Sequence, residues 1–264
     1  MITQRERAHL LKKLHIKGDP LILFNIWDAG SAQAIQEIGA KAIATSSWSV
    51  AAAHGYEDGE KLSFDLALAN LQRIIANVDL PVTVDLEGGY GQSPLQARET
   101  ISKVIEAGAV GINIEDQIIG QKHLYSIEDQ CARIKAVREA AEHTSIPLFI
   151  NARTDIFLKT DSSHHNDNHL EEALRRTVTY AKSGADGFFA PGLKDPNLIK
   201  KLCALSPIPI NVMMRLDMPS SKQLAEFGVA RISYGPGPYG QTMEALKEAG
   251  RNALSKISNR EAGE

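Results

Sequence analysis

The sequence has no excess of basic residues and no long apolar run. Lys and Arg number 29 against 32 Asp and Glu, a formal net charge of −3, and no Lys/Arg cluster interleaved with aromatic residues is present, so no nucleic-acid partner is expected. No stretch approaches the roughly 20 apolar residues of a membrane span. Residues 1–18 lack the apolar core of a signal peptide. We therefore expect a cytoplasmic protein that does not act at a membrane.

Cysteine is also scarce, with only Cys131 and Cys203, and both lie in stretches of helical periodicity. A disulfide framework or a cysteine-based zinc site is not expected from two such positions. The first glycine turn, "WDAGSA", lacks the G-x-G-x-x-G pattern of a dinucleotide-binding sheet. We therefore expect neither a disulfide-stabilised fold, nor a cysteine-based zinc protein, nor a dinucleotide-binding sheet.

Eight short β-rich runs alternate with stretches of helical periodicity along the chain. The runs cover residues 21–27, 42–48, 82–87, 111–116, 147–154, 187–192, 209–214 and 231–236. Eight such units over about 230 residues predict an α/β fold, a (β/α)8 TIM barrel, with a helix at about residues 3–14 outside the barrel or capping its bottom. An open doubly wound sheet is the alternative. With no linker or internal repeat, residues 1–264 are expected to form a single domain.

Polar side chains interrupt three of the predicted strands near their carboxyl ends, where barrel enzymes place their active sites. Side chains two residues apart share one face of a strand. The pattern therefore predicts three inward-facing sets, which are Thr83, Asp85 and Glu87; Asn113 and Glu115; and Asn151, Arg153 and Asp155. Neighbouring carboxylates repel unless a cation neutralises them, and an all-oxygen set favours Mg²⁺ or Mn²⁺.

A salt-bridge network is the alternative interpretation of the same residues. In that case Asp85 and Glu87 would pair with Arg153, and no metal would be needed. Glycines follow at positions 88, 89 and 91. Without a Cβ, they would let the backbone turn sharply and approach a ligand closely.

Several motifs together resemble the isocitrate lyase and phosphoenolpyruvate mutase superfamily. They are "NIWDAGSAQAIQEIGAKAIATSSWSVAAAHGYEDG", "VTVDLEGGYG", "GINIEDQ" and "FINARTDIF", within a match over about residues 18–240. The resemblance implies a (β/α)8 barrel, a last helix that is often swapped between subunits, a homodimer or homotetramer, Mg²⁺, and a small 2-oxo or dicarboxylic acid as the substrate.

The resemblance also assigns site residues. It implies Asp85, Glu87 and Glu115 around the metal, with Glu87 in place of a more usual aspartate. Substrate binding falls to Ser46, Ser47, Trp48 and Arg153, and Asp58 in "GYEDG" matches a mobile-loop aspartate that acts as a base or a positioning group. Asp58 is equally compatible with a plain turn residue before Gly59. The end of the seventh strand adds Asn211 as a further substrate-binding candidate.

The expected activity is a Mg²⁺-dependent lyase that cleaves a C–C bond through a stabilised enolate, with a 2-methylisocitrate-like or oxaloacetate-like substrate. The loop "DQIIGQKHLYSIEDQ" departs from the K-K/R-C-G-H loop of the superfamily's C–C lyases because it has no cysteine. His123, or else Lys122 or Tyr125, becomes the candidate proton donor. A C–P bond enzyme of the mutase or phosphonopyruvate hydrolase type, and a non-catalytic 2-oxo acid binding protein, are the alternatives.

Overall fold

A computed structural model of the chain describes residues 2–261, with side chains described through residue 255. Eight parallel strands form one nearly closed barrel in the order β1-β8-β7-β6-β5-β4-β3-β2. They are β1 (Leu21–Leu23), β2 (Ile43–Ala44), β3 (Val82–Asp85), β4 (Gly111–Glu115), β5 (Phe149–Arg153), β6 (Gly187–Phe189), β7 (Ile210–Met213) and β8 (Arg231–Ser233). The predicted (β/α)8 barrel is confirmed.

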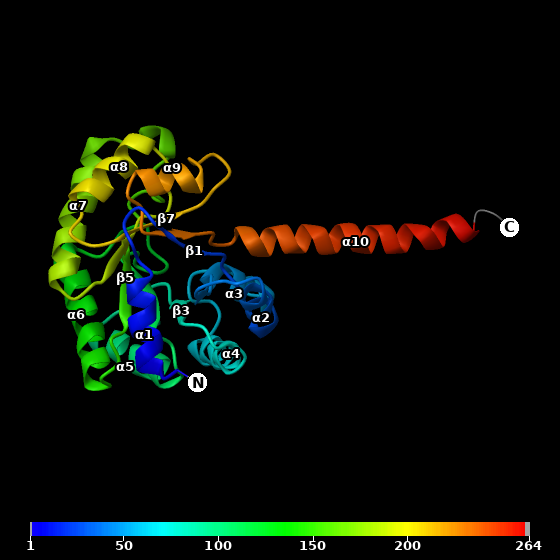
Figure 1. Cartoon of the computed structure of the whole chain (residues 1–264), viewed down its shortest axis with the longest axis horizontal. Helices are drawn as coiled ribbons and strands as arrows, with labels where there is room; N and C mark the ends of the chain where they lie inside the picture. Colours follow the sequence, from blue (N-terminus) through cyan, green and yellow to red (C-terminus); the bar gives the residue numbers. More distant parts are fainter. Residues whose placement is uncertain (1, 262–264) are drawn as a thin grey trace.

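Helices surround the strands on the outside of the barrel (Figure 1). They are α1 (Gln4–Lys13), α2 (Ala29–Glu37), α3 (Ser47–Ala53), α4 (Phe64–Ala76), α5 (Pro94–Glu106), α6 (Ile127–His143), the short 3-10 helix η1 (Ser162–His164), α7 (Asp167–Lys182), α8 (Pro196–Leu205), α9 (Ser221–Glu226) and α10 (Gly237–Glu261). In Figure 1, α10 leaves the barrel and projects away from it. Within residues 2–261, no helix is both long and apolar enough to cross a membrane.

The two edge strands meet through a single parallel bridge between Ile26 and Thr45. The amide of Ile26 donates to the carbonyl of Ala44 at 2.9 Å, and the amide of Ser46 donates to the carbonyl of Ile26 at 3.1 Å. These bonds bring the ends of the sheet together, so the open doubly wound alternative is wrong. Most of the predicted β-rich runs are longer than the strands that they contain, because the runs extend into the following loops.

The N-terminal helix caps the bottom of the barrel, which is one of the two positions predicted for it. Thr3 and Glu6 form a capping box that fixes the start of α1. Ala8 and Leu11 of α1 are buried in one apolar cluster with Leu21, Leu23 and Phe149. This packing closes the amino-terminal end of the strands, so the loops at the opposite end carry the open cleft.

Candidate active site

A cleft of about 150 Å³ lies at the carboxyl ends of the strands. It brings together six of the predicted site residues, which come from loops and strand ends far apart in the sequence: Ser46, Ser47, Trp48, Asp58, Asp85 and Arg153. Asn25, Asn113 and Ser233 add polar groups to its lining, and the rest of the described lining is apolar or glycine. The convergence follows from parallel strands whose carboxyl ends share one face of the barrel.

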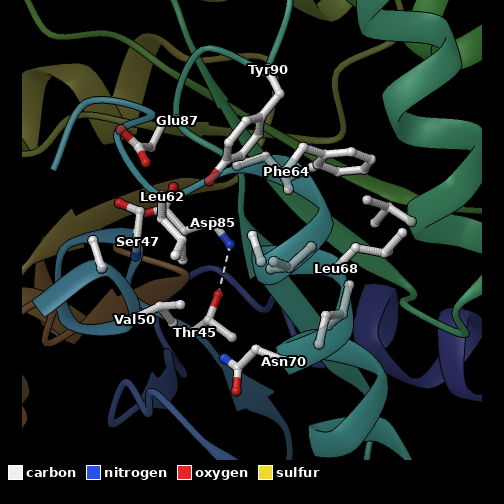
Figure 2. A pocket seen from close by; sticks show the side chains of 16 residues that line it. Thr45, Ser47, Val50, Leu62, Phe64, Leu68, Asn70, Asp85, Glu87 and Tyr90 are labelled. Atoms are coloured by element: carbon white, nitrogen blue, oxygen red, sulfur yellow. Dashed lines mark hydrogen bonds between the residues drawn. The ribbon is translucent and has the colours of Figure 1, made fainter. Parts of the chain in front are cut away.

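Asp85 ends β3 and keeps one carboxylate oxygen free. Its amide donates to the Thr45 hydroxyl at 2.9 Å, and its Oδ2 accepts from the Ser47 hydroxyl at 3.0 Å. Its Oδ1 is buried and has no hydrogen-bond partner among the described residues. In Figure 2, Ser47, Asp85 and Glu87 line one part of a small pocket, and apolar side chains such as Phe64 and Leu68 line another. An unpaired buried carboxylate oxygen is costly unless a ligand or water meets it.

Glu87 does not continue the inward face of β3. The strand ends at Asp85, and Glu87 adopts a left-handed conformation with φ of 51°, so the period-two alternation no longer applies. Its Oε2 accepts from the amides of Gly59 and Glu60 at 2.7 and 2.8 Å. Burial, with repulsion from Asp58, raises the pKa of Glu87 to about 8. Glu87 therefore holds the loop that carries Asp58.

Asp58 lies at the rim of the cleft, open to solvent on one side. Partial loss of hydration raises its pKa, and repulsion from Asp85 adds to the rise. The two carboxylates are therefore close enough to influence each other, which is the condition for sharing a cation or for proton transfer at the site.

The glycine-rich turn after β3 is shaped by packing. A Cβ at Gly88 would come within 2.9 Å of Ile119 and 3.0 Å of Glu60. Arg133 of α6 reaches this turn and donates to the carbonyls of Gly88, Gly91 and Gln92. Gly89 has a φ of 89°, in agreement with the sharp turn that the sequence suggested, whereas the space beside Gly88 is filled by Ile119 and Glu60 and not by a ligand.

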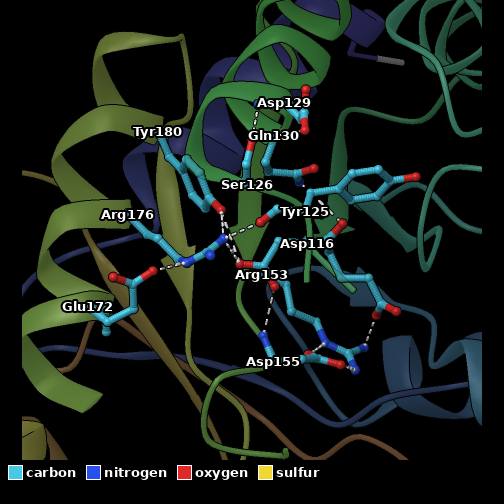
Figure 3. Close-up of polar contacts among 12 residues, drawn as sticks. Asp116, Tyr125, Ser126, Asp129, Gln130, Arg153, Asp155, Glu172, Arg176 and Tyr180 are labelled. Carbon is cyan, nitrogen blue, oxygen red and sulfur yellow. Dashed lines mark hydrogen bonds and ion pairs between the residues drawn. The ribbon is translucent and has the colours of Figure 1, made fainter. Parts of the chain in front are cut away.

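Arg153 ends β5 and is bound by two carboxylates. It pairs with Glu115 at 2.8 Å, and its Nε and Nη2 donate to Asp155 at 2.6 and 3.0 Å (Figure 3). Burial raises the pKa of Glu115, and Arg153 opposes that rise. The alternative network in which Asp85 and Glu87 pair with Arg153 is wrong, because the partners of Arg153 are Glu115 and Asp155 instead.

A second cluster lies behind β4, on the side of α7. The Asp116 carboxylate is fully buried and accepts from Arg176 at 2.9 Å, from the Tyr180 hydroxyl at 3.0 Å and from the Asp155 amide at 3.0 Å. Figure 3 shows Arg176 and Tyr180 on one side of Asp116 and the Arg153–Asp155 pair on the other. This cluster, defined by Asp116, Arg176 and Tyr180, fixes the backbone that carries Asp155.

The predicted metal ligands fit a cation only in part. Asp85 offers a free oxygen, whereas Glu87 binds loop amides and Glu115 binds Arg153. Across the described residues, no group of three or more His, Cys, Asp or Glu side chains is arranged to hold a metal ion. Asp85 nevertheless adds to the pKa rise of both glutamates by repulsion, so the three carboxylates lie near one another. The metal site stays a prediction, with Asp85 as its best-placed ligand.

The remaining candidates are not part of the cleft lining. Asn211 lies buried below the cleft, where its Oδ1 accepts from the Ser233 hydroxyl at 3.2 Å and its Nδ2 has no partner among the described residues. His123 and Lys122 are exposed in a short loop closed by a bridge between Gln117 and Leu124. Tyr125 packs its ring against the Arg133 guanidinium, 4.6 Å from the ring centroid. None of the three proposed proton donors lines the cleft.

Sequence reasoning missed several polar residues in or beneath the cleft, among them Asn25 and Arg231. The Asn25 amide nitrogen donates to the Thr45 carbonyl at 2.7 Å, and its oxygen accepts from the amides of Tyr234 and Gly235. An asparagine inside the apolar run "LILFNIW" was the available signal. Arg231 of β8 is buried beneath the cleft, and burial lowers its pKa to about 9. Nothing in the local sequence distinguishes it from a surface arginine.

Comparisons with known proteins agree with this architecture. A family model described as phosphoenolpyruvate phosphomutase matches residues 11–254. A crystal structure from Burkholderia cenocepacia, named only provisionally as a phosphonomutase, is 46% identical, with a TM-score of 0.93 over 95% of this chain and 99% of that chain. An uncharacterised protein of Mycobacterium tuberculosis is 32% identical over 90% of this chain and 86% of its own length. The 2-methylisocitrate lyase of Bacillus subtilis is 28% identical over 79% of this chain and 67% of its own length.

Proposed function

The chain belongs to the phosphoenolpyruvate phosphomutase family, and from this membership we propose that it is a Mg²⁺-dependent lyase that cleaves a C–C bond in a 2-oxo acid. The observation that carries the proposal is the unpartnered Oδ1 of Asp85, in the same cleft as Arg153. A free carboxylate oxygen suits a hard cation, and a partly exposed guanidinium at the cleft suits a carboxylate. Similarity to a 2-methylisocitrate lyase supports the choice of a C–C lyase.

The chain's own residues have distinct roles in this proposal. Arg153 would bind the substrate carboxylate, and Ser46, Ser47 and Trp48, which line the same cleft, would complete the binding site. Mg²⁺, bound by Asp85 with Glu87 and Glu115 nearby, would polarise the 2-oxo group and stabilise the enolate that C–C cleavage leaves; Mn²⁺ is chemically equivalent here. Asp58, with its raised pKa, would hold the proton delivered to carbon 3.

The test combines binding with product release. The melting temperature should rise when Mg²⁺ and pyruvate or another 2-oxo acid are added together, and a cleavable substrate should release pyruvate or a related 2-oxo acid only when Mg²⁺ is present. Stabilisation without turnover of any substrate would favour the non-catalytic binding protein. No stabilisation by any 2-oxo acid would contradict the proposal.

A C–P bond enzyme is the second candidate. It is favoured by the family match and by the 46% identical structure that is provisionally named a phosphonomutase. The same Asp85 and Arg153 would then bind phosphonopyruvate. Release of inorganic phosphate from phosphonopyruvate, or its conversion to phosphoenolpyruvate, would establish this activity in place of C–C cleavage.

We also propose a cytoplasmic homodimer or homotetramer in which α10 packs against a second copy. The helix projects from the barrel (Figure 1), and its Leu246 and Leu254 are exposed. An apolar groove over β1 leaves Ile22 and Phe24 42% and 37% exposed, which is a surface that a helix from another subunit would cover. Sedimentation velocity should give a dimer or a larger species, and a monomer at micromolar concentration would contradict the arrangement.

A further inference from the structure

The cleft has two chemically different walls. Strands β1 to β5 and the loops after them supply its charged and hydrogen-bonding side chains, such as Ser47, Asp85 and Arg153. Strands β6 to β8, with the loop that follows β5, supply mainly apolar side chains. These form the apolar wall, which we define as Leu158, Phe189, Pro191, Met213 and Pro236.

The apolar wall has free surface to offer a ligand. Leu158 is 40% exposed at the rim, and Trp48 is 44% exposed and also lines the cleft. None of the five side chains of the wall has a hydrogen-bond donor. Because burying apolar surface is favourable by about 25 cal/mol per Å², this wall favours an alkyl or aryl group. A carboxylate against it would lose its hydration without compensation.

Positive charge in the cleft suffices for one carboxylate. Among the described residues that line it, Arg153 carries the only positively charged side chain, and Glu115 and Asp155 already bind that guanidinium. The Arg231 guanidinium is buried beneath the lining, where it donates to Ser233 and Asn113. Asp58 and Asp85 add negative charge on the same side. A second or third substrate carboxylate would therefore face carboxylates or the apolar wall, and both arrangements are unfavourable.

We propose that the site takes a 2-oxo monocarboxylic acid with a hydroxyl on carbon 4 and an uncharged alkyl or aryl group beyond it, against the apolar wall. Cleavage of the C3–C4 bond would leave the enolate and release the rest as an aldehyde or ketone, and the hydroxyl proton would pass to carbon 3 by way of Asp58. This inference rests on the proposed function, because it assumes that Arg153 and the bound cation hold the 2-oxo acid end. It departs from the dicarboxylic and tricarboxylic substrates expected from the sequence. It also disfavours the C–P alternative, since a phosphonate is a second charged group on carbon 3.

An outer cavity adjoins the cleft beyond Met213 and Pro236, and it has basic residues. Lys194 and Arg215 line it. Lys194 is paired with Asp217 at 2.5 Å, and Arg215 also lies close enough to lower the pKa of that carboxyl. Asp217 thus offsets part of this positive charge. A long dicarboxylic acid that reached this cavity is the alternative that the experiment must separate.

The experiment compares two acids of equal main-chain length by calorimetry in the presence of Mg²⁺. In 4-methyl-2-oxopentanoate the chain ends in an isopropyl group, whereas in 2-oxoglutarate it ends in a second carboxylate. We expect 4-methyl-2-oxopentanoate to bind at least about tenfold more tightly, because the wall buries its methyl groups and provides no cation for the second carboxylate.

A charge placed on the apolar wall should change this preference. Met213→Lys should tighten 2-oxoglutarate and weaken 4-methyl-2-oxopentanoate, so that the ratio of the two dissociation constants falls about tenfold or more. The matched control is Leu205→Lys at the exposed end of α8, where the leucine is 63% exposed. It adds the same charge away from the cleft and should leave the ratio as in the unmodified chain.

The outcomes separate this inference from the function on which it rests. If 2-oxoglutarate binds more tightly than 4-methyl-2-oxopentanoate, the inference is overturned and the 2-oxo acid site stands. If neither acid binds, and pyruvate with Mg²⁺ does not bind either, the proposed function falls and the inference falls with it. A tighter alkyl acid whose advantage Met213→Lys reduces would establish the apolar wall as the determinant of substrate class.

Discussion

Glu115 and Asp116 are neighbours in the chain, yet their carboxylates lie on opposite sides of the barrel wall. Glu115 meets Arg153 at the cleft, while Asp116 meets Arg176 and Tyr180 behind β4. Burial raises the pKa of both. The shift therefore does not distinguish a ligand-binding group from a structural one.

The number of hydrogen bonds that a carboxylate already accepts does distinguish a structural group from one that can bind a ligand. Asp116 accepts on both oxygens from three donors of the chain itself, so it has little capacity left for a ligand. Asp85 keeps one buried oxygen without a partner. We conclude that Asp85 is available for chemistry, whereas the Asp116 cluster holds the backbone in place.

Asp85→Asn tests the cleft side of this comparison and should have the largest effect. The change removes the charge of the free oxygen but keeps the contact to Ser47, so we expect Mg²⁺-dependent turnover to fall on the order of a thousandfold with little change in the urea midpoint. Steady-state kinetics and calorimetry with Mg²⁺ check it. Unchanged Mg²⁺-dependent activity would contradict the assignment of Asp85.

Asp116→Asn tests the buried side. It removes the buried negative charge to which Arg176 and Tyr180 donate, while Arg176 keeps its pair with Glu172, so we expect a loss of about 3 kcal/mol in the free energy of unfolding, measured by urea denaturation. Binding of 2-oxo acids to the folded fraction should weaken much less than in Asp85→Asn. Loss of ligand binding at unchanged stability would reverse the two roles.

The pH dependence of stability tests Glu87, which lies near Asp85 at the cleft but, like Asp116, is held by donors of the chain itself. Its pKa is near 8 in the folded chain, above its ordinary value of 4.5. Its protonated form is thus favoured by folding, and the metal-free protein should lose stability as the pH rises from about 4.5 to 8. Bound Mg²⁺ favours the ionised form, so the increase in melting temperature with Mg²⁺ should be larger at pH 8.5 than at pH 6. An increase that does not depend on pH would separate Glu87 from the metal.

Tyr180→Phe should have the smallest effect. It removes one of three donors to Asp116 without removing a charge, and the expected loss is about 1 kcal/mol of unfolding free energy. Thermal and urea denaturation measure it. A loss as large as that of Asp116→Asn would show that the hydroxyl contributes as much as the whole carboxylate. That result would contradict the view that Tyr180 is only one of three donors to Asp116.

Much of the architecture could be predicted from the sequence. Period-two and helical patterns located all eight strands, and the polar residues at their ends predicted that Asp85 and Arg153 would meet, whereas Ser47 was assigned only by the family resemblance. Glu87 was misplaced because the alternation rule ends with the strand, and a left-handed turn begins at that point. The burial of Arg133, Arg176 and Arg231 could not be predicted, because an arginine on an amphipathic element is usually solvated.

The sequence by itself determined the order of strands and helices and the positions at which strands end in polar residues, because these depend on patterns a few residues long. Only the tertiary structure decided which carboxylates are satisfied and which wall of the cleft is apolar. Asp116 receives its partners from residues 39 to 64 positions away. The donors available to a carboxylate depend on which distant elements pack beside it, and no local pattern encodes that.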